Sequence, residues 1–196
     1  MSHNIEENVS RESLEQLHAY DALLHKWQKT INLVSRNTLH ESWDRHVLDS
    51  VQMAQYVSRE SRTLYDLGSG AGFPGLVLAI LRPDLDVHLI ESDLRKCSFL
   101  KAVSRETGAS VTVHNSRIEA VDLPSPDVVT ARALASLDKL VGFCKPWERK
   151  GLQGLFLKGE TYQSEIDEVN KSHDVECDTL PSKTSFSSAI VEVKWH

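Results

Sequence analysis

The sequence predicts an α/β protein with a doubly wound, mostly parallel sheet, preceded by a helical extension. Two observations carry this prediction. Residues 1–60 show only the apolar spacing that is typical of helices, whereas from residue 62 short β-like runs alternate with helical patterns. Such alternation requires right-handed crossovers, which place helices on both faces of a parallel sheet. We therefore expect an extension over residues 1–60, packed against one compact sheet domain over residues 61–196.

Two helices are predicted in the extension. The first follows Ser10 and Ser13, which are candidate N-caps. Its apolar residues recur every three to four positions, at Leu14, Leu17, Leu24, Trp27 and Ile31. The second helix runs from about Thr38 to Tyr56, and its apolar residues are Trp43, Val47, Leu48, Val51 and Met53. We interpret the two tryptophans as core anchors rather than as platforms on which bases stack.

Six strands and four helices are predicted after residue 61. The strands are expected at 63–67, 87–91, 111–115, 127–131, 154–159 and 189–195. The helices are expected at 75–81, 93–108 and 136–145, and after Glu160. Pro74 stands near the first turn of one helix, where its missing N–H costs nothing, and Gly108 ends the next.

The net charge of −6 argues against nucleic-acid binding until its distribution is considered. Residues 159–180 contain seven acidic residues and one basic residue, which leaves 21 of each sign elsewhere. One acidic segment therefore accounts for the whole imbalance, and the rest of the chain can still present a basic face.

The sequence favours a cytoplasmic protein. It has no apolar run of 18 residues, and its first 15 residues are polar and acidic, unlike a signal or transit peptide. Its three cysteines, Cys97, Cys144 and Cys177, show no CxxC spacing, so we expect neither a disulfide framework nor a metal site. Nothing in the sequence demands more than a monomer.

Residues 64–75 read LYDLGSGAGFPG and predict a ligand site. A strand, three closely spaced glycines and a helix form the nucleotide-binding arrangement at the end of the first strand of such sheets. Glu91 ends the second predicted strand about 20 residues further on, where an acid binds ribose hydroxyls. The loop lacks the lysine of a phosphate-binding P-loop. The alternative is a tight turn that binds nothing.

The loop favours S-adenosylmethionine over a dinucleotide. Its spacing is G-x-G-x-G rather than G-x-G-x-x-G, and Phe73 and Pro74 occupy the start of the following helix. Asp66 directly precedes the glycines, and a carboxylate there suits a cationic sulfonium better than a pyrophosphate. A nicotinamide-dependent oxidoreductase remains the alternative at this point.

The segment DLGSGAGFPG resembles the glycine motif of the small-subunit ribosomal RNA guanine-N7 methyltransferases, a family first named glucose-inhibited division protein B. Other segments between about Leu24 and Gly159 are similar to that family too: KWQKTINLVS, WDRHVLDSV, ESDLRKCSFL, SRIE, TARALASL and FLKG. The resemblance implies a class I S-adenosylmethionine-dependent methyltransferase fold, which is a Rossmann-like, seven-stranded, doubly wound sheet with an N-terminal helical extension. It also implies methyl transfer to N7 of a guanine in 16S (small-subunit) ribosomal RNA.

The resemblance implies a set of cofactor contacts. Gly68 and Phe73 would line the path of the methionine and adenosine, and Ile118 and Glu119 would hold the adenine. Arg132 would lie beside the methionine and the target base. The general logic of the fold adds the remaining candidates from the first two strand ends, which are Asp66, Gly70 and Glu91.

Basic residues near the same strand ends are candidate RNA contacts. Arg117 and Arg132 follow predicted strands, and we expect them to orient the base and the RNA backbone during catalysis. Lys158 ends a strand on the same edge and joins them as an RNA-binding candidate. Arg95 and Lys96, in the first turn of a helix, are further candidates, although solvated charges explain them equally well.

Other candidates have simpler structural explanations. His46 and Asp49 lie three residues apart on one helical face, as a catalytic dyad or as a polar contact within the helix. The resemblance favours a structural role, with Asn32 and His46 tying the extension to the core. The thiols of Cys97 and Cys144 are interpreted as small buried hydrophobes. In place of a basic residue that the family carries before its last strand, this chain has Ser187 and Ser188, which puts one RNA contact in doubt.

The expected chemistry needs no general base. Guanine N7 carries an in-plane lone pair and no proton, so the enzyme must mainly hold it in line with the methyl–sulfur bond. Three alternatives stay open beside this reading. They are an NAD-dependent oxidoreductase, a non-catalytic RNA-binding protein with a vestigial loop, and a methyltransferase acting on another RNA, a protein or a small molecule.

Overall fold

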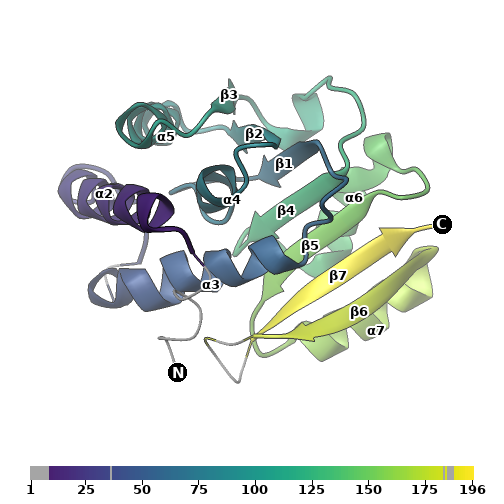
Figure 1. The fold of residues 1–196 in the computed structure, drawn as a ribbon. Coiled ribbons are helices and arrows are strands. Elements are labelled where there is room, and N and C mark those ends of the chain that lie inside the picture. The colour runs from purple at the N-terminus through teal and green to yellow at the C-terminus, as the bar shows by residue number, and fades with distance from the viewer. Residues whose placement is uncertain (1–8, 36, 183, 185–187) are drawn as a thin grey trace.

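The computed structural model describes residues 9–35, 37–182, 184 and 188–196. A seven-stranded sheet with the order β3-β2-β1-β4-β5-β7-β6 forms its centre, and helices cover both faces (Figure 1). The first five strands are parallel, whereas β7 is antiparallel to both of its neighbours. The predicted doubly wound, mostly parallel sheet is therefore confirmed.

Six of the seven strands lie where the sequence predicts them. Their bounds are β1 Thr63–Leu67, β2 Asp86–Glu91, β3 Val111–Asn115, β4 Val128–Arg132, β5 Gln153–Lys158 and β7 Ala189–Trp195. Strand β6 (Val175–Pro181) was not predicted from the residues. It is an edge strand within the acidic segment, and Val175 and Cys177 contribute only partly buried side chains to the core. Its hydrophobic pattern is correspondingly weak.

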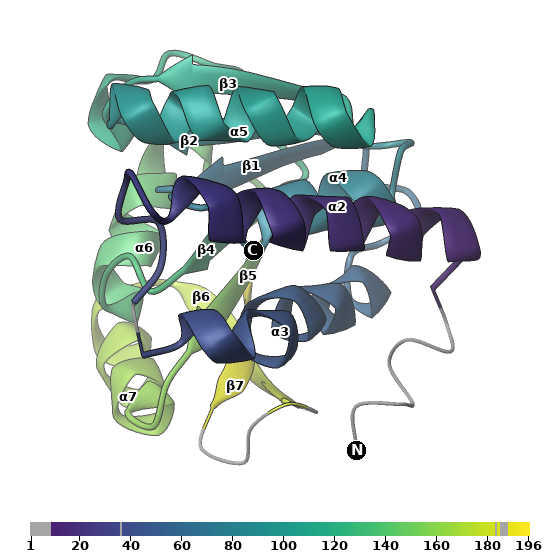
Figure 2. The same cartoon turned by 90° about the vertical axis from the view of Figure 1, so that its left-hand side faces the viewer.

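Three regular helices and one irregular run cover the first face. The regular helices are α2 Arg11–Trp27, α4 Gly75–Leu81 and α5 Leu94–Thr107. The second predicted helix is a mixed run of η1 (Leu39–Glu41), a π-helix η2 (Trp43–Leu48), α3 (Asp49–Val51) and η3 (Gln52–Gln55). Figure 2 shows α2 lying between α5 and this run on one side of the molecule. π-Helical turns occur frequently at functional sites.

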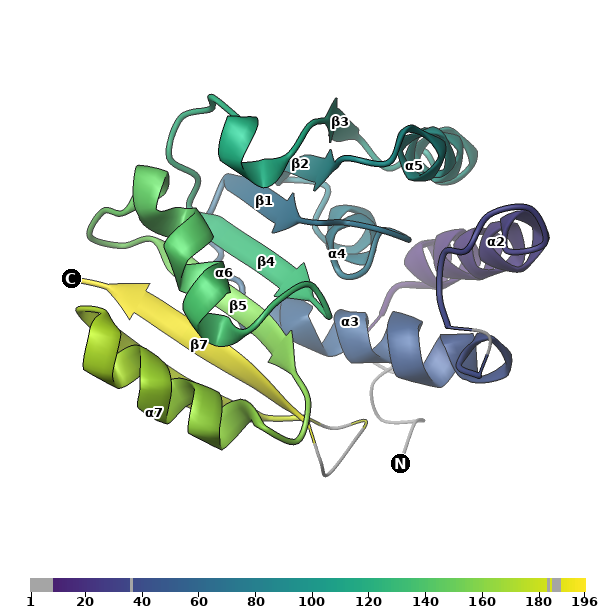
Figure 3. The same cartoon turned by 180° about the vertical axis from the view of Figure 1, so that it is seen from behind.

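Two helices and a short turn cover the opposite face. They are α6 (Leu137–Cys144), η5 (Lys145–Trp147) and α7 (Tyr162–Ser172), and Figure 3 shows α6 and α7 in front of the sheet. Their apolar side chains pack against one another and against Phe156 and Val191 of the sheet. No helix in the described part of the chain has the length and apolar character that crossing a membrane requires.

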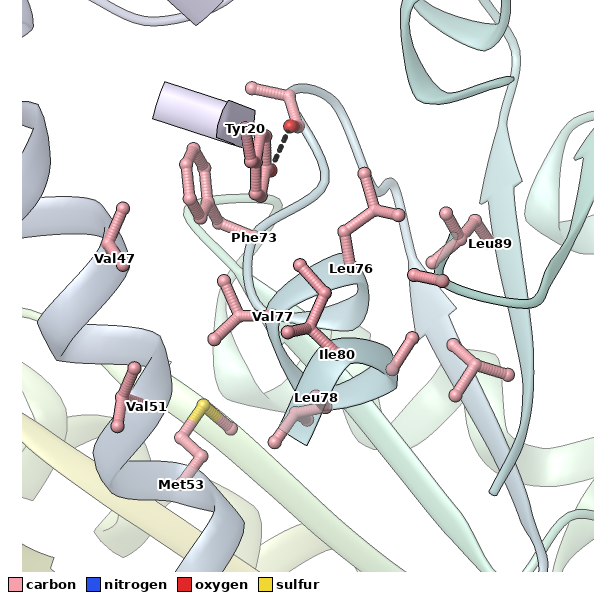
Figure 4. Packing of buried hydrophobic residues seen from close by; sticks show 14 of the residues in the cluster. Tyr20, Val47, Val51, Met53, Phe73, Leu76, Val77, Leu78, Ile80 and Leu89 are labelled. Atoms are coloured by element: carbon pink, nitrogen blue, oxygen red, sulfur yellow. Dashed lines mark hydrogen bonds between the residues drawn. The ribbon is translucent and has the colours of Figure 1, made fainter. Parts of the chain in front are cut away.

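The extension shares the hydrophobic core of the first face. Leu17, Tyr20 and Leu24 of α2 are fully buried in the same cluster as Leu76 of α4 and Phe99 of α5 (Figure 4). The tryptophans of the extension pack at the border of this cluster, as expected for core anchors. The extension is therefore part of the folded unit, while a domain boundary near residue 60 stays a prediction.

Helix α4 approaches the sheet at its first residue, Gly75. A Cβ atom there would lie 2.5 Å from a methyl of Leu89 and 2.7 Å from the Cβ of Asp66. A Cβ at Gly142 in α6 would instead meet no atom within 4 Å. Only glycine therefore allows α4 to sit this close to β1 and β2.

We expect Gly75→Ala to lower the free energy of unfolding by about 1–3 kcal/mol, because overpacking forces the helix away from the sheet. The matched variant Gly142→Ala should raise it by about 0.5–1 kcal/mol, since alanine is the better helix former. Urea titration of both variants checks this. Equal stability of Gly75→Ala and the wild type would contradict the packing argument.

Candidate active site

A pocket of about 870 Å³ opens at the carboxyl ends of the central parallel strands. The glycine loop after β1, the end of β2 and the loops after β3 and β4 line one part of it. Residues between 33 and 49 of the extension line the other part. Open α/β sheets bind their ligands at this edge, and the volume suits a ligand the size of a nucleoside.

The glycine loop is tied to the end of β2 through Glu91. One carboxylate oxygen of Glu91 accepts a hydrogen bond from the N–H of Gly70 at 2.9 Å, and the other accepts from the N–H of Asp93 at 2.7 Å. Gly68 and Gly70 have φ angles of 60° and 56°, which favour glycine. Glu91 is thereby held at the wall of the pocket, as the sequence predicts for a ribose-binding acid.

Asp66 does not face the pocket, which corrects the expectation that it contacts the ligand. Its side chain is fully buried beneath the glycine loop, where Oδ1 accepts a hydrogen bond from the hydroxyl of Thr130 at 2.8 Å. Burial raises the pKa of Asp66 to about 6, although hydrogen bonds from Thr130, Ser69 and Gly75 oppose the shift. Asp66 therefore lies beneath the glycine loop and stabilises it from the interior of the protein.

The ring of Phe73 is contacted by three side chains from three other elements, α2, η2 and β4. Tyr20 of α2 stacks on it with the centroids 5.0 Å apart, and the guanidinium of Arg132 lies 5.0 Å from its centroid. His46 of η2 lies 5.4 Å away. The hydroxyl of Tyr20 also donates a hydrogen bond to the carbonyl of Ala71, so α2 contacts the glycine loop twice (Figure 4).

Arg132, at the end of β4, joins the sheet to the extension. Its Nη1 donates a hydrogen bond to the carbonyl of Arg45 at 3.0 Å and lies 3.9 Å from Oδ2 of Asp49. Asp49 also accepts hydrogen bonds from Thr184 at 2.6 Å and from Gln52 at 2.8 Å. Arg132 lines the pocket as predicted, but its side chain is only 16% exposed and is largely engaged by the extension.

His46 is a neutral side chain in the pocket wall. Its Nε2 lies 3.1 Å from the hydroxyl of Thr38, which itself donates to the carbonyl of Ser35, so Nε2 carries the proton. Burial, together with the charges of Arg132 and Arg45, lowers the pKa of His46 to about 3. Within the described chain no hydrogen bond joins His46 to Asp49, and the alternative of a catalytic dyad is not supported.

Ile118 and Glu119, predicted to hold the adenine, lie in the pocket together with Arg117 and Lys96, predicted to contact RNA. Arg117, Ile118 and Glu119 line it from the loop after β3, where η4 (Ile118–Ala120) begins, and Lys96 lines it from the first turn of α5. Arg95 does not line the pocket. Its side chain is exposed and lies 3.8 Å from Asp93, which is the position of an ordinary solvated surface charge.

Lys158 is not free to contact RNA as predicted, because its ammonium group already has partners within the protein. Its Nζ donates a hydrogen bond to the carbonyl of Ala135 at 2.8 Å and forms an ion pair with Glu165 at 2.7 Å. Only 9% of its side chain is exposed. This arrangement does not support the expectation that Lys158 contacts RNA, since contact would require the lysine to leave a buried pair.

Several pocket residues were missed by the sequence interpretation. They come from the extension and from the connection between β6 and β7, and they are Leu33, Val34, Ser35, Thr38, Asp44, Arg45 and Thr184. Ser187, named with Ser188 for a missing basic residue, lies outside the described residues. Among the described residues, the side chain of Asn32 accepts a hydrogen bond only from Gln28 of the extension itself, at 3.4 Å, and no tie from Asn32 to the core is seen there. Within the described residues no group of three or more metal-ligating side chains is found.

Solved structures similar to this chain share its fold. A ribosomal protein L11 methylase from Lactobacillus delbrueckii subsp. bulgaricus aligns with a TM-score of 0.64 at 12% identity, over 78% of this chain and 79% of that chain. The mitomycin 7-O-methyltransferase MmcR aligns with a TM-score of 0.66 at 14% identity, over 91% of this chain and 67% of that chain. The architecture is therefore that of class I methyltransferases.

Sequence comparison assigns the family. A family model described as "GidB: rRNA small subunit methyltransferase G" matches residues 13–189. A protein of Parvibaculum lavamentivorans named "Ribosomal RNA small subunit methyltransferase G" is 48% identical over 95% of this chain and 85% of its own length. A Ruegeria protein of the same name is 43% identical over 97% of this chain and 95% of its own. The chain belongs to the family of the rRNA small subunit methyltransferase G proteins.

Proposed function

We propose that this protein transfers a methyl group from S-adenosylmethionine to N7 of a guanine in 16S ribosomal RNA of the small subunit. Family membership supports the reaction class and the acceptor. The observation that carries the proposal in the molecule is the composite pocket, in which a glycine loop backed by Glu91 faces a wall from the extension. Together they provide one place for the methyl donor and one for the target guanine.

The donor side has the features that an adenosyl ligand requires. The backbone of Gly70 is bare, because a Cβ atom there would meet only the carbonyl of Gly68 at 3.6 Å. Glu91 is held in place by two N–H groups to accept hydrogen bonds from ribose hydroxyls. Gly68, Phe73, Ile118 and Glu119 would line the remainder. When bound, S-adenosylmethionine supplies an electrophilic methyl group on a sulfonium.

The protein contributes position rather than proton transfer. N7 of guanine has a free lone pair, and His46, the imidazole in the pocket wall, is neutral with a pKa of about 3. Arg132 and Arg117 would orient the base and its backbone at the rim. Holding the reacting atoms about 3–3.5 Å apart can supply about 7–11 kcal/mol of the barrier.

The charge distribution supports RNA on the side of the extension. Most of the acidic segment lies on α7 and β6, at the opposite end of the sheet from β3 and α5 (Figure 3). Arg117 follows β3, and Lys96 belongs to α5. The phosphates of an RNA loop would contact the basic rim and avoid the acidic edge. The target base must be unstacked to enter the pocket, as in a loop of the RNA.

The remaining expectations belong to the same proposal. A monomer is supported because Leu94 and Leu134 are the only large hydrophobic side chains exposed in the described part of the chain. A reducing cytoplasm is supported because the three cysteines are free and two of them are buried. A single compact unit with an extension ending near residue 60 is supported by the shared core.

Methylation should be specific for one guanine. Small subunits and ribosomal RNA from cells lacking the enzyme are incubated with labelled S-adenosylmethionine, and borohydride and aniline then cleave the RNA at N7-methylguanine. We expect label and one cleavage site with the wild type. Arg132→Ala should lower the rate about 100-fold through lost positioning. Arg149→Ala, near the amino ends of the parallel strands, should keep the wild-type rate. Label without cleavage would mean another acceptor atom, and binding of NAD alone would overturn the reaction class.

The rate should not depend on the protonation of His46. We expect kcat to be constant between about pH 7 and pH 9, because no proton leaves N7 and the imidazole is neutral throughout this range. His46→Gln should keep the same flat profile even if the rate itself falls. A fall in kcat toward low pH with an apparent pKa near 6.5–7.5, absent from His46→Gln, would show that this histidine acts as a base.

A further inference from the structure

The loop that follows Arg132, residues 133–136, adopts a conformation that must be held from outside. Ala133 has a φ of 51°, in the left-handed region that favours glycine. Such residues persist where surrounding contacts determine them. The side chain of Leu134 reaches across to Gly68, because a Cβ on Gly68 would lie 2.5 Å from a methyl of Leu134. The conformation of this loop thus determines both where the backbone of Arg132 lies and where the side chain of Leu134 covers the glycine loop.

A buried ion pair holds this loop from the side opposite to the extension. Lys158, at the end of β5, donates to the carbonyl of Ala135 at 2.8 Å and to Oε2 of Glu165 at 2.7 Å. The two charged side chains are 9% and 17% exposed. A pair this sheltered is weakly screened by solvent, so it can fix the geometry of what it contacts.

Glu165 extends the contact to the start of α6. Its Oε2 accepts a hydrogen bond from the N–H of Leu137 at 2.6 Å, and its Oε1 accepts from the hydroxyl of Thr161 at 2.9 Å. Ser136, at the N-cap position of α6, makes no capping bond of its own. Burial alone would raise the pKa of Glu165, but Lys158, Leu137 and Thr161 lower it overall, so the carboxylate is ionised. The C-terminal end of loop 133–136 and the start of α6 are therefore bonded to one pair.

We propose that Lys158 and Glu165 are positioning residues for methyl transfer, which set loop 133–136 so that Arg132 faces the pocket and Leu134 covers Gly68. This role rests on the proposed function, and it replaces the expectation that Lys158 binds RNA. In the described part of the chain, no hydrogen bond or ion pair joins these two residues to the glycine loop or to Arg132. The pair acts through the carbonyl of Ala135 and the N–H of Leu137.

Calorimetry with S-adenosylhomocysteine tests the donor side without any RNA. We expect Lys158→Met and Glu165→Gln each to weaken binding about tenfold, which is about 1.4 kcal/mol. The double variant should be no weaker than the worse single variant, because both changes remove one interaction. Lys158→Arg keeps the charge and the donors and should bind within about twofold of the wild type. Arg149→Met, which breaks the 2.7 Å ion pair with Asp127 at the opposite edge, should bind normally.

Steady-state methylation and RNA binding separate this role from direct contact with RNA. Positioning predicts a lower kcat for Glu165→Gln and Lys158→Met, with the KM for RNA and the salt dependence of RNA binding unchanged. Should Lys158→Met fail to fold, Glu165→Gln and Lys158→Arg still decide the outcome. Normal S-adenosylhomocysteine affinity in Glu165→Gln, or a loss of RNA affinity confined to Lys158→Met, would overturn the proposal. A wild type that binds S-adenosylhomocysteine but methylates no ribosomal RNA would instead overturn the proposed function and leave this coupling measurable.

Discussion

The contacts around the Phe73 ring connect the glycine loop, the extension and the end of β4. Tyr20 stacks on the ring from α2, the guanidinium of Arg132 lies 5.0 Å from its centroid, and His46 borders it from η2. Tyr20 also donates a hydrogen bond to the carbonyl of Ala71 within the glycine loop. A loop whose glycines allow many conformations is thereby held in one. The cofactor side and the acceptor side are consequently parts of one packed structure.

This arrangement explains how a chain can catalyse methyl transfer with few reactive groups. The alkylated nitrogen needs no proton removed, so correct position is most of what the protein must supply. In the proposed mechanism the base is positioned by Arg132, which the carbonyl of Arg45 holds on one side. The loop after Arg132 is bonded through Ala135 and Leu137 to Lys158 and Glu165. The side chain that would orient the base is therefore fixed from two directions.

Local patterns predicted most of the fold, and contacts between distant segments account for what they missed. The alternation of strands and helices and the glycines before α4 are short-range signals, and they predicted Glu91 at this edge of the sheet, whereas Ile118 and Glu119 came from the family resemblance. The sequence pattern did not predict strand β6, because an edge strand in an acidic segment buries little apolar surface. The carboxylate of Asp66 turns toward Thr130, 64 residues away, and Lys158 is paired with a residue of the following helix. The sequence did not show that residues 33–49 form a pocket wall, because nothing local says which face of an extension meets the sheet.

Tyr20 provides the most direct test that the extension shapes the cofactor site. Tyr20→Phe removes only the hydroxyl that binds Ala71, and Tyr65→Phe removes a matched one, since buried Tyr65 donates to the carbonyl of Pro124 at 2.8 Å on the other face of the sheet. Each loss of a buried hydrogen bond should lower stability by about 1–3 kcal/mol. Calorimetry with S-adenosylhomocysteine should show about fivefold to tenfold weaker binding for Tyr20→Phe and unchanged binding for Tyr65→Phe. Equal affinities for the two variants would contradict the account.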